Sequence, residues 1–95
     1  MNRTLFNLKE YGVFTFISTS QALKAERVLK QASIDFLMMP TPREISTSCG
    51  LAVKVASEDL GESSEVLRQN RVQVDGAYQV SQLQGKTRTE RVIDG

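Results

Sequence analysis

The chain has 95 residues, one cysteine and no histidine; 40% of it is hydrophobic, 24% is charged, and the formal net charge is +1. These values are typical of one small globular domain, and such a low charge excludes the strong basic field that marks nucleic acid or an anionic membrane as a partner. The cysteine and histidine counts also exclude an internal disulfide, a Cys/His metal site and a Ser-His or Cys-His catalytic pair within one chain, so we expect no metal and no cofactor.

Residues 11–40 predict a strand, a helix and a second strand. The segment 11–17 is rich in aromatic and β-branched residues, which indicates a buried strand. Ser18 and Gln21 have the spacing of a capping box, so a helix should begin there. Residues 36–39 are a short apolar run that ends at Pro40, which is typical of a strand.

Residues 51–80 repeat this order. In the segment 51–56, Leu and Val alternate with Ala and Lys, which predicts a half-buried strand. Ser57 is followed by two acidic residues, a pattern that favours a helix start. Residues 72–80 keep a period of two around Gly76, so they predict a last strand that carries a β-bulge.

The order β-α-β-β-α-β predicts an α+β fold. We expect a ferredoxin-like sandwich, in which a four-stranded antiparallel sheet carries both helices on one face. The predicted domain covers residues 11–80. Residues 1–10 would be an N-terminal extension, and residues 81–95, which are polar and mixed in charge, a flexible C-terminal tail.

The loop of residues 41–50 contains Cys49, the one cysteine. Its surroundings in sequence are hydroxyls, Gly50 and the guanidinium of Arg43, a setting that favours a reactive thiolate. Gly50 permits unusual backbone angles and should leave one side of the sulfur open. Against this, a lone cysteine in a small domain is about as often inert packing. Arg43 with Glu44, in turn, can be a simple solvated pair at a short helical turn that begins at Thr41.

The predicted topology places this loop beside the first helix. The third strand would lie antiparallel between the first two, so Cys49 should sit next to the end of the first strand. The helix begins there, at Ser18, Thr19 and Ser20. A helix N-terminus binds anions, so it could stabilise a thiolate or persulfide on Cys49, together with Arg43, Ser48 and the backbone at Gly50. The simpler interpretation is that these three hydroxyl residues only cap the helix.

The sequence resembles the family called putative selenium/sulfur carrier protein-like. The most specific stretch is PTPREISTSCGLA, at residues 40–52. Weaker stretches are YGVFTF at 11–16, STSQALKAE at 18–26 and VDGAY at 74–78, so the likeness spans about residues 11–80. The resemblance implies that Cys49 holds sulfur or selenium, with Arg43 and Gly50 in the flanking motif.

Three functions fit the sequence. The first is a carrier that receives sulfur or selenium on Cys49 from a cysteine desulfurase-type donor and passes it, as a persulfide or selenylsulfide, to an acceptor protein. Such a protein is a relay rather than a free-standing enzyme, and we expect it in the cytoplasm. The second is a regulatory module that binds a small ligand or a protein, often as a homodimer, with Cys49 incidental. The third is a thiol redox sensor that uses a resolving thiol from another chain.

Overall fold

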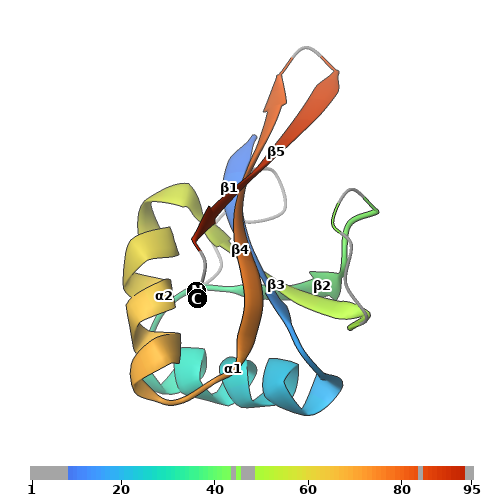
Figure 1. The fold of residues 1–95 in the computed structure, drawn as a ribbon. Helices are drawn as coiled ribbons and strands as arrows, with labels where there is room; N and C mark the ends of the chain where they lie inside the picture. The colour runs from blue at the N-terminus through green and yellow to red at the C-terminus, as the bar shows by residue number, and fades with distance from the viewer. Residues whose placement is uncertain (1–8, 44, 46–48, 84, 94–95) are drawn as a thin grey trace.

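The strands of the protein form one antiparallel sheet with two helices packed against it (Figure 1). The computed structural model describes residues 9–43, 45, 49–83 and 85–93. In chain order the elements are β1 (Glu10–Phe16), α1 (Thr19–Gln31), β2 (Leu37–Pro40), β3 (Leu51–Ala56), the 3₁₀ turn η2 (Ser57–Asp59), α2 (Leu60–Gln69), β4 (Val74–Leu83) and β5 (Lys86–Ile93).

Within the part of the chain that the structure describes, the sheet has five strands, so the prediction of four was wrong. Its order is β2-β3-β1-β4-β5, in which β3 lies antiparallel between β1 and β2, as predicted. The fifth strand comes from the segment that was expected to be a polar tail. Its side chains are mostly exposed, so it lacks the alternation of apolar and polar residues by which a half-buried strand is recognised. Its pairing follows instead from a two-residue connection in which Gly85 has φ +78°, typical of a tight hairpin.

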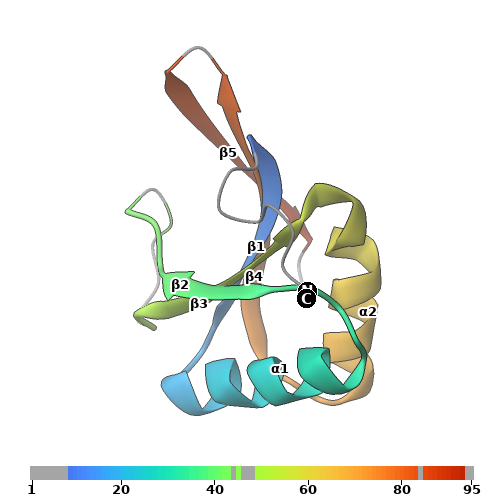
Figure 2. The same cartoon turned by 180° about the vertical axis from the view of Figure 1, so that it is seen from behind.

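Both helices pack on the same face of the sheet, as Figures 1 and 2 show from opposite sides. Phe14 and Phe16 of β1 are fully buried between the sheet and the helices, because alternate residues of a strand point to the same face. The Ser18 hydroxyl accepts a hydrogen bond from the Gln21 backbone N–H at 3.3 Å, so the predicted helix cap is confirmed. Other fully buried members of this core include Ala22, Ala25, Leu29, Val53, Val55 and Leu67.

The opposite face of the sheet carries a second, smaller cluster. It includes Tyr11, Val13, Tyr78 and Val80, with no helix residue among its described members. Lys54 of β3 is buried at this face, and its Nζ lies 4.1 Å from the centroid of the Tyr11 ring. An ammonium over an aromatic ring is stabilised by the ring's negative face, which offsets part of the cost of removing the charge from water.

Lys54 should make stability depend on pH. Burial lowers the pKa of Lys54 below its ordinary value of 10.5. Between the lowered pKa and 10.5 the unfolded chain binds more protons than the folded one, so the free energy of unfolding should rise with pH in this window. We expect Lys54→Met to flatten that rise in urea titrations, while Lys30→Met, on the exposed side of α1, keeps it. Equal slopes for wild type and Lys54→Met would contradict the assignment.

Candidate functional site

The candidate site is the loop that connects β2 to β3 and contains Cys49. Its two ends are held together as a continuation of the strand pair, because the Thr41 backbone N–H donates to the Gly50 carbonyl at 3.0 Å. Pro40 and Leu51 form the last ladder pair of β2 and β3. Cys49 therefore directly precedes Gly50, whose carbonyl is held by this hydrogen bond.

The Cys49 side chain points into the protein. It is 5% exposed and belongs to the core cluster between the sheet and the helices. Its Sγ donates a hydrogen bond to the Leu51 carbonyl at 3.4 Å. The expectation that one side of the sulfur is open was therefore wrong, since the alternation that buries Val53 and Val55 reaches back along the chain to Leu51 and Cys49.

Thr41 holds the cysteine from across the loop. Its Oγ1 donates to the Cys49 carbonyl at 2.9 Å. Sequence reasoning assigned Thr41 to a helix cap and missed this role. The signal that could have found it is the strand register, because Pro40 pairs with Leu51 and so brings Thr41 opposite Gly50 and next to Cys49.

The loop is anchored on both faces of the sheet. Ile45 is 5% exposed and packs in the cluster that contains Tyr11 and Val13, whereas Cys49 packs on the helix side. The Ile45 N–H donates to the Pro42 carbonyl at 3.1 Å, which closes a turn at Arg43. Ser48, a predicted site residue, lies outside the described residues.

The other predicted site residues are distributed around the same end of the sheet. Thr15 pairs with Ala52, and Cys49 precedes Ala52 by three residues just as Ser18 follows Thr15 by three. The start of α1 and the start of β3 therefore share one end of the sheet. Ser18 is the helix cap, and Thr19 and Ser20 are exposed in the first turn. That these groups act on the Cys49 sulfur stays a prediction.

Arg43 and Gly50 are both exposed. Whether the Arg43 guanidinium reaches the sulfur stays a prediction. Gly50 does not adopt the left-handed backbone that favours glycine, and a Cβ built on it meets nothing within 4 Å. The backbone freedom that glycine permits is therefore not used at Gly50. Its contribution is an open surface directly beside the cysteine backbone.

We expect Thr41→Val to make local opening around Cys49 easier, while the shape of side chain 41 stays nearly the same. The variant loses the hydrogen bond to the Cys49 carbonyl and should cost about 1 kcal/mol of local stability. A local opening that is easier by this amount should make Cys49 react about fivefold faster with a thiol reagent. Thr87→Val on the distant β5 is the matched control and should leave the rate unchanged. An unchanged rate in Thr41→Val would show that this hydrogen bond does not limit access.

Among the described residues, no group of three or more His, Cys, Asp and Glu is placed to hold a metal ion. The same part of the chain contains no helix long and apolar enough to cross a membrane.

Comparison with known proteins gives one finding. A family model described as "Putative Se/S carrier protein-like" matches residues 11–79, a stretch that contains the whole loop and both helices. No curated protein and no solved structure matches the chain.

Proposed function

Because the family model covers more than half of its residues, the chain belongs to the putative Se/S carrier protein-like family, and we propose that it carries sulfur or selenium on Cys49 and relays it between proteins. The observation that supports this most is the placement of the chain's single thiol. Cys49 lies in the matched segment, on a loop pinned at both ends, at the end of the sheet where α1 begins.

The loading step is a thiol–persulfide exchange. The Cys49 sulfur attacks the outer sulfur of a persulfide on the donor, a cysteine desulfurase-type protein. One S–S bond forms on Cys49, the donor's S–S bond breaks, and the Cys49 proton leaves with the donor thiolate. No net oxidation or reduction occurs. Unloading is the same exchange with the roles reversed, because the acceptor thiol then attacks the outer sulfur of the Cys49 persulfide. If the donor bears selenium in place of the outer sulfur, the loading step would give the selenylsulfide.

Burial of Cys49 imposes a condition on this relay. The sulfur must turn outward to meet a donor, which breaks the hydrogen bond from Sγ to the Leu51 carbonyl. The exposed Gly50 leaves the adjoining backbone uncovered, so the approach is open on that side. Between transfers, the inward position would shield a persulfide from oxidants and stray thiols.

The supporting groups have a definite task in the proposal. The outer sulfur of a persulfide carries negative charge when it is deprotonated, and the N-terminus of α1 carries a partial positive charge. The first turn of α1 at Thr19 and Ser20, together with Arg43 and Ser48, would bind that charge when the sulfur faces outward. The relay would operate in the cytoplasm, where a solitary thiol stays reduced.

Sulfur loading tests the proposal. The protein is incubated with a cysteine desulfurase and cysteine, separated, and its intact mass is measured. We expect the gain of one sulfur atom, and transfer of that sulfur to an acceptor when a thiol protein is added. A protein that stays unmodified while the desulfurase turns over would contradict the proposal.

One observation favours a second function, a binding module in which Cys49 is incidental. The thiol packs in the core like a small apolar side chain. On this hypothesis Cys49→Ala keeps full biological activity, whereas the carrier proposal predicts that the same variant loses it.

A further inference from the structure

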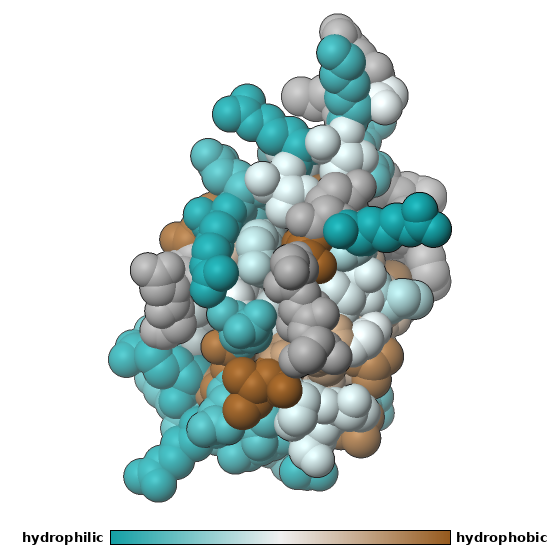
Figure 3. Space-filling view, turned by 45° about the vertical axis from the view of Figure 1, so that its right-hand side comes forward, coloured by the Kyte–Doolittle hydropathy of each residue, from teal (hydrophilic) through white to brown (hydrophobic). Residues whose placement is uncertain are grey.

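Among the strands of the described residues, none pairs with the outer edge of β5. The family match ends at residue 79, so β5 belongs to the part of this chain that the family model does not describe. The end of the β4–β5 hairpin projects beyond the body of the protein (Figure 1), and its surface is mainly hydrophilic (Figure 3). Exposed strand edges pair readily with other strands unless their side chains prevent it.

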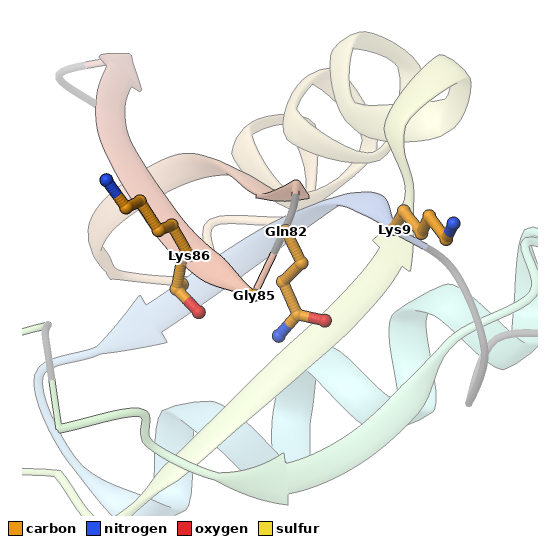
Figure 4. A pocket seen from close by; sticks show the side chains of 5 residues that line it. Lys9, Gln82, Gly85 and Lys86 are labelled. Carbon is orange, nitrogen blue, oxygen red and sulfur yellow. The ribbon is translucent and has the colours of Figure 1, made fainter.

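The pocket beside this hairpin does not form a ligand site. It has a volume of about 510 Å³ and is lined by Lys9, Gln82, Gly85, Lys86 and Thr87. Figure 4 shows that the amino groups of Lys9 and Lys86 point away from each other, with Gln82 between them. Two diverging lysines do not converge on one anion, so the edge of β5 is the stronger feature.

We propose that the occupant of this edge is β5 of a second copy of the chain, paired antiparallel about Thr89. In this register Thr89 lies opposite Thr89 of the second copy, and Arg88 lies opposite Glu90. The twofold axis repeats the Arg88–Glu90 pair on the other side of the centre. Directly opposed side chains of antiparallel strands lie on the same face and interact, and both Thr–Thr and opposite-charge pairs are favourable.

The neighbouring registers are disfavoured by charge. In a symmetric pair of β5 strands, a twofold axis perpendicular to the sheet requires that opposed residues lie on the same face. The axis must therefore pass beside a residue of β5, and each alternative register is centred on a different residue. Centring on Arg88 opposes two arginines, and centring on Glu90 opposes two glutamates. Like charges directly opposite are destabilising. The charged side chains of β5 therefore disfavour the neighbouring pairings of this edge and favour the register centred on Thr89.

The backbone also suits the Thr89 register. Leu83 and Lys86 flank the two-residue connection and form the first pair of the hairpin. From this hydrogen-bonded pair onward, non-hydrogen-bonded and hydrogen-bonded pairs alternate along the hairpin. Thr87, Thr89 and Arg91 belong to the non-hydrogen-bonded pairs, so their N–H and C=O groups point to the outer edge of β5. In the proposed dimer Thr87 meets Arg91 of the second copy, and these three residues bond across the interface.

The dimer leaves the candidate site accessible. The cysteine loop joins β2 to β3 at the opposite edge of the sheet order, and β1 and β4 lie between β3 and β5. The inference does not depend on the proposed function. It gives a molecule with two separate Cys49 loops on one continuous sheet.

Charge reversal tests the register. The full-length protein is examined by sedimentation equilibrium over a range of concentrations and salt. We expect a weak dimer that dissociates further at high salt, because the ion pairs are exposed. Arg88→Glu alone and Glu90→Arg alone should each weaken association about tenfold or more. An equal mixture of the two variants should restore it, since each Glu then opposes an Arg, and the double variant Arg88→Glu/Glu90→Arg should also associate.

The controls separate the interface from general charge effects. Arg27→Glu on the exposed side of α1 should associate as the wild type does. Circular dichroism melts verify that each variant is folded, and restored association in the mixture excludes unfolding as the cause of any loss. A wild-type chain that stays monomeric up to about 1 mM would overturn the proposal. Single variants that dimerise like the wild type, or a mixture that does not, would also overturn it.

Discussion

Gly12→Ala is expected to lower the free energy of unfolding by about 1–3 kcal/mol, as overpacking of a core typically does. Gly12 lies in β1 on the helix side, and a Cβ built on it would stand 2.5 Å from Leu60 Cδ1 and 3.3 Å from Leu60 Cβ. Leu60 is buried at the first position of α2. Rotating the side chain moves Cδ1 but does not relieve the contact with Cβ, so the first turn of α2 must shift by a few tenths of an ångström.

Two variants make this measurement specific. Gly50→Ala is the matched control, because the same added methyl group meets nothing within 4 Å, and we expect a change of less than about 0.5 kcal/mol. In a Leu60→Ala background the cost of Gly12→Ala should shrink, since the two sites are in contact and their effects do not add. Equal urea midpoints for wild type and Gly12→Ala would contradict the close packing of α2 on β1.

Cys49→Ser is expected to abolish the acceptance of sulfur from a desulfurase. The serine hydroxyl is close in shape but does not form the sulfur–sulfur bond on which the exchange depends. The variant should remain folded, because a serine hydroxyl fits the space of the Cys49 thiol and can also donate to the Leu51 carbonyl. Arg43→Gln should slow loading while leaving the final amount unchanged, since Arg43 is proposed to support the charge and not to carry the sulfur.

The fold could be predicted from the sequence where side chains are half-buried. The aromatic and β-branched residues of 11–17 mark β1, and the spacing of Ser18 and Gln21 marks the start of α1. The bulge expected near Gly76 occurs there, where the register moves from Thr15–Gly76 to Phe16–Val74. In α2 the buried residues are Leu60, Ser63 and Leu67. Strand β5 was missed because pairing along an exposed edge leaves no apolar period in its sequence.

The candidate site was predictable only in part. The strand order, and hence the approach of the loop to the start of α1, follows from the βαββ pattern. The burial of Cys49 did not follow, because serines and a glycine surround it in sequence while the strand register turns it inward. The hydrogen bond from Thr41 to Cys49 was also missed, since it joins residues whose proximity depends on the pairing of β2 with β3.

The most direct test is to locate the sulfur. After incubation with a desulfurase and cysteine, the protein is digested with trypsin, which cleaves after Arg43 and Lys54, and the mass of peptide 44–54 is measured with and without a reducing thiol. The carrier proposal predicts one extra sulfur on this peptide, removed by the thiol and absent in Cys49→Ser. A peptide 44–54 that never gains sulfur, under conditions in which a known acceptor does, would contradict it.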